Sequence, residues 1–238
     1  MEFDALYQPY PSRRSVVYGK NGMVATSQSL AAQAGLAILR QGGNAVDAAV
    51  ATAACLTVVE PTCNGIGGDA FALVWMKDKL YGLNSSGPAP QSLTVEEVEK
   101  RGHRQMPHNG WLPITVPGAP AAWGELISRF GKLTLSQVLA PACQYAAEGF
   151  PVSPVVAGLW QSGLERFLVE KGPEFRPWFD TFAPDGRAPR AGEIWRSAHH
   201  AQTLRAIGET GSKAFYSGTV AEKIAAHAKR YGGYLTAH

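Results

Sequence analysis

The residues most suggestive of chemistry are three closely spaced glycines, Gly65, Gly67 and Gly68. Together with Ala70 they match the relaxed G-x-G-x-x-A pattern of dinucleotide-binding loops, in which a strand leads into the loop and a helix N-terminus faces the phosphates. Here the order is reversed, because a helical stretch precedes the loop and a strand-like stretch follows it. The C-terminal end of a helix carries partial negative charge, which repels phosphate. We therefore expect a helix-to-strand turn that lines a ligand pocket, with glycines at positive φ.

Other nucleophiles and metal ligands are sparse in the sequence. The histidines form no H-E-x-x-H motif and no zinc-type spacing with cysteine, so we expect neither a metal nor another cofactor. We interpret the pair at 199–200, which opens a predicted helix, as a solvated cap region. Cys55 falls in an apolar stretch and is predicted to be an inert buried thiol, whereas Cys63, next to the glycine loop, is predicted to be more exposed. A nucleophilic role for Cys63 stays open, but no partner base is evident and no G-x-S-x-G motif occurs.

The composition is that of a globular protein with little charge. Of the 238 residues, 45% are hydrophobic and only 17% are charged, which predicts much buried surface or a face covered by another chain. The net charge of +3 is spread without a basic run, so we expect no nucleic-acid partner. Glu2 and Asp4 stand where a signal peptide carries positive charge, and no apolar stretch is long enough to cross a bilayer. We expect a cytoplasmic protein without membrane contact.

Two helices and a hairpin are predicted around the glycine loop. The first helix covers residues 30–41, with Ser27 or Ser29 as its cap, and ends at a pair of glycines. The second covers residues 45–59, capped by Asn44 with Asp47 three residues later, and is apolar almost all round, as in a helix sandwiched between layers. After the loop, FALVWM has the length and content of a buried strand, and it continues into a β-hairpin over 71–84.

The rest of the chain is predicted to be mainly helical, and we expect a single domain over 1–238. Residues 1–22 are an irregular N-terminal arm, and residues 173–189, rich in proline and aromatic side chains, are also predicted to be irregular. The further predicted helices cover residues 92–100, 121–130, 136–148 (capped by Thr134 or Ser136), 198–211 and 217–233.

Several segments together resemble one family. They are MVATSQSLAAQAGLAILRQGGNAVDAAVATAACLTVVEP, NGIGGDAFALVW, ITVPGAPAAW, KLTLSQVLAPACQYAAEGFPVSP and AFYSGTVAEKIAAHAKRYGGYLTAH, and they cover most of residues 22–238. In this order they resemble the γ-glutamyltransferase family of N-terminal-nucleophile hydrolases, including its cephalosporin-acylase-like branch. The resemblance implies an α+β fold, the αββα sandwich of two stacked sheets flanked by helices.

The resemblance also implies a mechanism and a partner. Members of the family are made as a precursor that cuts itself into a larger N-terminal and a smaller C-terminal subunit. The cut frees a threonine whose hydroxyl attacks the amide of a small γ-glutamyl or other acyl-amide substrate, with its own amino group as base. The present sequence resembles the large-subunit portion. We therefore expect the nucleophile on a small-subunit partner and assign no catalytic residue to this chain; the near-terminal Thr236 does not match the nucleophile segment.

One substrate-binding segment can be placed by the resemblance. The family carries an arginine after the hairpin that pairs with the α-carboxylate of the glutamyl group, and Ser86 takes its position when the sequences are aligned on Ala89-Pro90. We expect Asn84, Ser85 and Ser86 to line the acyl pocket together with the glycine loop. Loss of a charge-assisted hydrogen bond costs about 1.5–3 kcal/mol, so we expect an acylase, or a weak γ-glutamyl hydrolase, in place of a glutathione enzyme. A plain turn without a ligand would explain the same residues.

Three hypotheses on function therefore stand. The first is an amide hydrolase or acyltransferase whose N-terminal portion is this chain. The second is a catalytically inactive scaffold that serves as a binding or interaction module. The third, a dinucleotide enzyme, is disfavoured by the order of helix, loop and strand.

Overall fold

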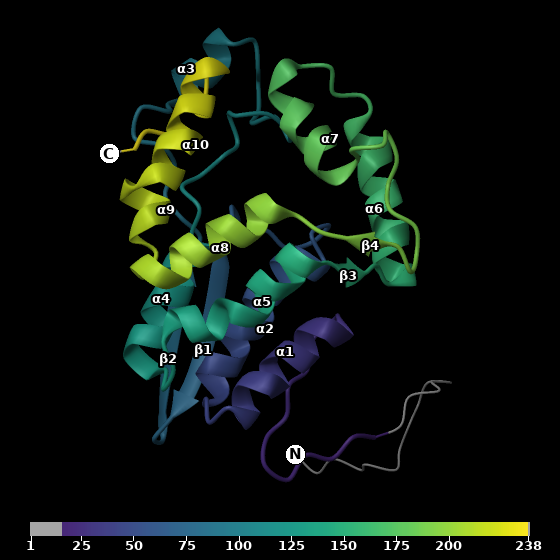
Figure 1. Ribbon diagram of the computed structural model, residues 1–238. Coiled ribbons are helices and arrows are strands. Elements are labelled where there is room, and N and C mark those ends of the chain that lie inside the picture. The colour runs from purple at the N-terminus through teal and green to yellow at the C-terminus, as the bar shows by residue number, and fades with distance from the viewer. Residues whose placement is uncertain (1–15, 238) are drawn as a thin grey trace.

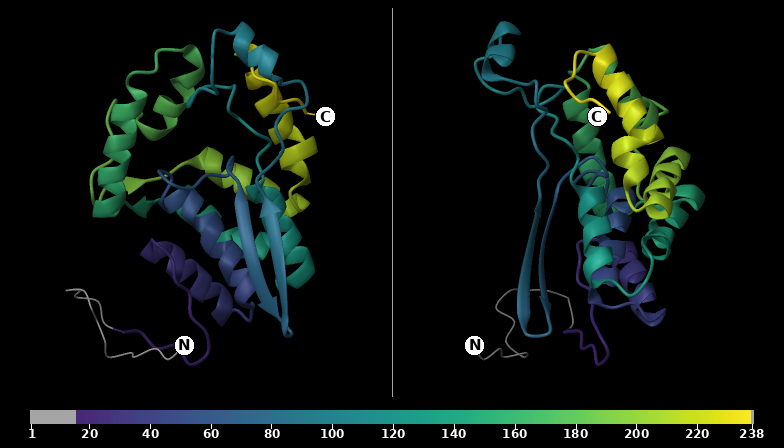
Figure 2. Two further views of the ribbon diagram at one scale, coloured as in Figure 1. Left: turned by 180° about the vertical axis from the view of Figure 1, so that it is seen from behind. Right: turned by 90° about the vertical axis from the view of Figure 1, so that its left-hand side faces the viewer.

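The computed structural model describes residues 16–237. Its helices form a layer, and a β-hairpin lies flat against one side of this layer (Figures 1 and 2). The elements, in chain order, are α1 (Ser29–Arg40), α2 (Ala45–Val59), β1 (Ala70–Met76), β2 (Lys79–Ser85), α3 (Val95–Lys100), α4 (Ala119–Phe130), α5 (Leu135–Glu148), β3 (Phe150–Pro151), α6 (Pro154–Phe167), the 3-10 helix η1 (Pro173–Phe175), α7 (Arg176–Phe182), β4 (Ile194–Trp195), α8 (Ala198–Thr210), α9 (Lys213–Ser217) and α10 (Thr219–Arg230).

The predicted N-terminal arm lies mostly outside the described residues, and its described part, 16–22, contains no helix or strand. None of the helices in residues 16–237 is both long and apolar enough to cross a membrane.

Helix α2 is the centre of the helical layer and contacts α1, α4 and α5. Its predicted cap is confirmed, since the Asn44 side chain accepts from the backbone N–H groups of Val46 and Asp47 while the Asp47 carboxylate accepts from the N–H of Asn44. The predicted cap of α1 is wrong. Gln28 caps that helix, and the Ser27 hydroxyl instead donates to Glu60 over 2.6 Å. Serine is the commoner N-cap residue, but here the hydroxyl of Ser27 is engaged by Glu60 and so does not cap the helix.

The buried carboxylate of Asp47 also joins distant parts of the layer. It accepts hydrogen bonds from the backbone N–H groups of Lys132 (3.0 Å) and Leu133 (3.3 Å), in the turn between α4 and α5. The Asn44 amide donates to the carbonyl of Phe130, the last residue of α4, at 2.6 Å. Because the Asp47 side chain is fully buried and accepts only from backbone donors, it fixes the α4–α5 turn against the start of α2.

The hairpin is confirmed, but its burial differs from the prediction. Lys77 and Asp78 form the turn, both at positive φ, as a two-residue type I′ turn requires. One face of the hairpin packs on the helical layer, with α4 against both strands. The other face is exposed and apolar, formed by Phe71 (64% exposed), Leu73 (79%), Trp75 (68%) and Leu80 (57%). Strand β1 is therefore half-buried rather than buried, because the described residues provide a covering layer on one side only.

An aromatic cluster lies at one side of the molecule, where the short β3 and β4 strands pair and α6 and α7 pack (Figure 1). Trp160 lies at its centre, with its ring edge-on to Phe182 and Trp195 and its indole N–H donating to the carbonyl of Phe182 at 2.8 Å. Helix α6 has no counterpart among the predicted elements, although Ser153 caps it and Pro154 occupies its first turn. The expectation of an irregular stretch over 173–189 is wrong for residues 173–182, where aromatic packing stabilises η1 and α7.

Candidate active-site loops

Three loops that carry the recognisable motifs meet at the open end of the hairpin. The Gly68 carbonyl accepts from the backbone N–H groups of Gly118 (2.8 Å) and Ala119 (3.0 Å), at the start of α4. The Ser85 hydroxyl donates to the carbonyl of Gly118 at 2.8 Å, and the Val116 N–H donates to Pro88 at 2.9 Å. The glycine loop, the segment after β2 and the segment before α4 are thus joined by backbone hydrogen bonds.

Two glycines permit this close approach. Gly87 has a φ of +74°, and a Cβ placed there would overlap the carbonyl of Val116. A Cβ on Gly118 would overlap the carbonyl of Ser85 in the same way. A larger residue at either position would push the loops apart.

The glycines first noticed in the sequence behave differently from the prediction. Gly65, Gly67 and Gly68 all lie outside the left-handed region, so the expected positive φ is wrong. All three are exposed, and a Cβ on Gly67 would meet nothing within 4 Å. The predicted order is confirmed, because the loop follows the C-terminus of α2 and leads into β1. This order is opposite to that of a dinucleotide site.

The predicted substrate-binding residues lie beside this loop. Because Ala70 pairs with Ser85, the end of β2 is next to the glycine loop. Asn84 and Ser86 are exposed, with the Asn84 side-chain oxygen accepting from the N–H of Ser86 at 3.0 Å, and Ser85 is half-buried. The structure therefore brings all six predicted residues to one end of the hairpin. That they bind substrate stays a prediction.

Comparison with known proteins identifies the family. The model of the gamma-glutamyltranspeptidase family matches residues 31–238. The chain belongs to this family. Residues 1–30 precede the match, and all three loops at the open end of the hairpin fall inside it.

Individual relatives support the family assignment. A glutathione hydrolase-like proenzyme of Bacillus subtilis, YwrD, is 39% identical over 225 residues, which are 92% of this chain and 41% of the relative. The crystal structure of a cephalosporin acylase from Bacillus halodurans superposes with a TM-score of 0.93 at 58% identity, covering 100% of this chain and 45% of that one. The gamma-glutamyltranspeptidase of Helicobacter pylori superposes with a TM-score of 0.85 at 31% identity, covering 93% of this chain and 64% of that one.

The chain thus spans less than half the length of the first two relatives. Its mixed helices and strands match the large-subunit part of the N-terminal-nucleophile hydrolase fold, which confirms the predicted fold class.

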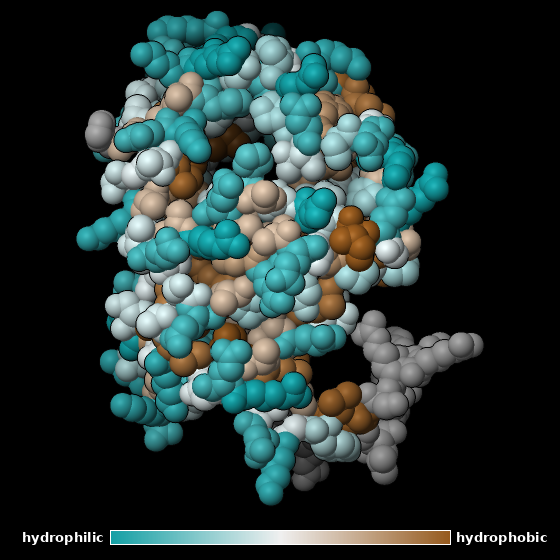
Figure 3. All heavy atoms as spheres, in the orientation of Figure 1, coloured by the Kyte–Doolittle hydropathy of each residue, from teal (hydrophilic) through white to brown (hydrophobic). Residues whose placement is uncertain are grey.

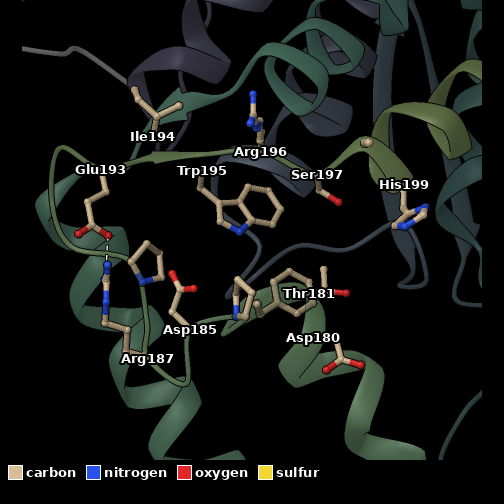
Figure 4. Close-up of a pocket in the computed structure, with 14 residues that line it drawn as sticks. Asp180, Thr181, Asp185, Arg187, Glu193, Ile194, Trp195, Arg196, Ser197 and His199 are labelled. Atoms are coloured by element: carbon tan, nitrogen blue, oxygen red, sulfur yellow. Dashed lines mark hydrogen bonds and ion pairs between the residues drawn. The ribbon is translucent and has the colours of Figure 1, made fainter.

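A cavity of about 370 Å³ lies apart from the family's motif loops, between the segment after α7 and the start of α8 (Figure 4). Its charged residues include an ion pair of 2.8 Å between Arg187 and Glu193. Figure 4 shows Asp185 and the indole of Trp195 on facing walls. Within residues 16–237, no three His, Cys, Asp or Glu side chains are grouped closely enough to hold a metal ion.

A serine–histidine contact at the wall of this cavity is a helix cap. The Ser197 hydroxyl lies 2.8 Å from Nδ1 of His200 and also accepts from the His200 backbone N–H, as the N-cap of α8. Burial lowers the pKa of His200, and the neighbouring His199 lowers it further. Among the described residues no carboxylate is hydrogen-bonded to His200, whose ring contacts Phe182 and Trp195. The predicted solvated cap region is therefore right for the exposed His199 and wrong for the partly buried His200.

The cysteines separate as predicted. Cys55 is fully buried, and desolvation raises its pKa to about 12, so its thiol is inert. Cys63 is exposed at the start of the glycine loop, where the Thr62 hydroxyl lies 3.8 Å from its sulfur. No histidine is hydrogen-bonded to Cys63 within the described residues, and the structure gives it no activating base.

Proposed function

We propose that this chain is the N-terminal, large-subunit portion of an amide hydrolase or acyltransferase. In this proposal a second polypeptide segment carries the catalytic threonine, whose hydroxyl attacks the substrate amide while its own amino group takes up the proton. The amide C–N bond then breaks, the amine leaves with that proton, and the acyl group on the threonine oxygen passes to water or to an acceptor amine. The chain itself contributes the scaffold and one wall of the acyl site. Membership in a family whose relatives include proenzymes and an acylase supports this proposal.

The observation that carries the proposal is the exposed apolar face of the hairpin. Four large side chains on this face, Phe71, Leu73, Trp75 and Leu80, are more than half exposed. Such a contiguous apolar patch typically marks an interface. In an αββα sandwich this face packs against a second sheet, so a layer formed by the remainder of the protein is the expected cover.

The open glycine loop supports the same arrangement. Among the described residues nothing lies within 4 Å of a Cβ placed on Gly67, so packing does not explain why this residue lacks a side chain. A close approach from the catalytic segment or the substrate would explain it. We place the acyl site above this loop, beside Asn84, Ser85 and Ser86.

The proposed substrate class is an acyl amide without an α-amino acid head. Ser86 offers a neutral hydroxyl where a γ-glutamyl enzyme of the family has a guanidinium, and a hydroxyl makes no bidentate pair with a carboxylate. The similarity to a cephalosporin acylase agrees with this choice.

A charged substitution on the hairpin face tests the assembly. Leu73→Asp places a charge at the centre of this face but leaves the packed face of the hairpin unchanged. We expect the complete protein to lose self-processing and amidase activity, because an unpaired charge between two sheets costs several kcal/mol. Asp78→Asn, in the exposed turn of the same hairpin, is the control and leaves both unchanged. Full processing and activity in Leu73→Asp would refute the proposed cover.

A gain of charge tests the acyl site. In the complete protein, Ser86→Arg is expected to raise hydrolysis of γ-glutamyl anilides about tenfold, the equivalent of one charge-assisted hydrogen bond. Ser86→Gln, which is long but uncharged, serves as the control and gives no such gain. An unchanged rate in Ser86→Arg would show that residue 86 is not at the acyl site.

A further inference from the structure

A hollow lies between α10 and α7, far from the hairpin face (Figure 1). Figure 3, drawn in the orientation of Figure 1, shows the surface hollowed here, with apolar atoms at the back. The hollow has a volume of about 310 Å³, which is at the lower end of the range for small-molecule sites. Four separate segments line it: residues 108–114, the end of α6, the η1–α7 segment and α10.

Aromatic rings form most of its wall. Phe167 and Trp178 stack in parallel with their centroids 4.3 Å apart, and Phe175 meets Phe167 edge-on at 6.1 Å. Across from them, Trp111 lies 5.4 Å from the ring of His227. Rings held in this way by one another provide rigid surfaces for an apolar or cationic ligand.

Two polar groups in this hollow lack a partner. The Nε2 atom of His227 is buried and makes no hydrogen bond. Glu174 also lines the hollow, and its carboxylate forms no ion pair or hydrogen bond with any of the described residues. No lysine or arginine is among the lining residues. An unpaired carboxylate beside aromatic rings favours a ligand that donates hydrogen bonds and carries positive charge.

The His227 ring packs between Trp111 and Tyr231, and its Nε2 has no accessible surface. Burial, first, and then the charge of Arg230 lower its pKa, while Glu174 raises it. The net lowering favours the neutral imidazole, which adds no positive charge that would repel an ammonium group in the hollow.

We propose that this hollow binds a primary amine with a compact aromatic or apolar body. The body lies against Trp111, Phe175 and Trp178, and the ammonium group donates to the Glu174 carboxylate. This inference does not depend on the proposed function, because none of these residues belongs to the hairpin or the glycine loop.

Calorimetry on the complete protein with matched probes tests the proposal. 2-Phenylethylamine, 2-phenylethanol and 3-phenylpropionate present an ammonium, a neutral hydroxyl and a carboxylate on similar bodies. We expect the amine to bind about tenfold more tightly than the alcohol, and the carboxylate more weakly still. No binding of the amine at millimolar concentration, or equal affinity for amine and alcohol, would overturn the proposal.

Two variants locate the site. Glu174→Gln keeps the shape of the side chain and is expected to remove the preference for amine over alcohol. Trp178→Leu removes a ring from the wall and is expected to weaken the amine and the alcohol alike, severalfold. Glu165→Gln, on the exposed side of α6, is the matched control and leaves binding unchanged. An undiminished affinity of both site variants for the amine would place its binding elsewhere and refute the inference.

Discussion

Removal of the Asp47 carboxylate is predicted to be among the most damaging single changes to the fold. This side chain is fully buried and accepts hydrogen bonds from the backbone N–H groups of Asn44 (2.7 Å), Lys132 (3.0 Å) and Leu133 (3.3 Å). Asp47→Ala leaves these three donors without their partner. Each unsatisfied donor costs about 1–3 kcal/mol, and water that enters the vacated space recovers part of the sum. We expect a loss of about 3–5 kcal/mol in the free energy of unfolding.

Urea unfolding monitored by circular dichroism measures this loss. Asp47→Asn retains one oxygen acceptor but turns an NH₂ group toward backbone donors, so a smaller loss of about 1.5–3 kcal/mol is expected. Glu99→Ala, an exposed acid on α3, is the control and changes stability by less than about 0.5 kcal/mol. A stability of Asp47→Ala within about 1 kcal/mol of the original protein would refute the view that this carboxylate fixes the α4–α5 turn.

Three further predictions concern reactivity, pH and backbone contact. Ellman's reagent should modify Cys63 rapidly in the folded chain and reach the buried Cys55 and Cys143 only on unfolding; rapid reaction of all three would contradict the packing. Because burial lowers the pKa of His200, the unfolded chain binds its proton more readily, so stability should fall as the pH drops below about 6.5. His200→Phe should reduce this slope between pH 8 and pH 5.5, and an unchanged slope would assign the effect elsewhere. Gly118→Ala should lower the unfolding midpoint, because its Cβ overlaps a carbonyl of the facing loop; an unchanged midpoint would show that the loops separate at no cost.

The elements best predicted from the sequence are those with local signals. The capping-box residues Asn44 and Asp47 indicate the start of α2. Two strand-like runs around a short polar turn predict the hairpin. The prediction fails where a contact with a residue distant in sequence determines the local structure. The predicted cap of α1 is wrong because the Ser27 hydroxyl is hydrogen-bonded to Glu60, which lies 33 residues away in sequence. The exposure of β1 was not predictable from FALVWM, since the same run fits a strand covered on one side or on both.

The sequence identifies the segments of the candidate site but not the contacts between them in space. Sequence motifs select the glycine loop and residues 84–86, and strand pairing brings them together. The role of Gly118 was missed, although the glycine in the VPG segment is a signal of close backbone approach. The hollow around His227 and Glu174 combines four segments distant in sequence, and no local pattern indicates it.

The measurement that tests the central claim most directly is the intact mass, with N-terminal sequencing, of the protein made from the complete reading frame that contains this chain. Our account predicts two fragments: a large one that includes residues 31–238 and a smaller one that begins with threonine. A single uncut polypeptide, without amidase activity, would contradict the account and favour an inactive binding scaffold.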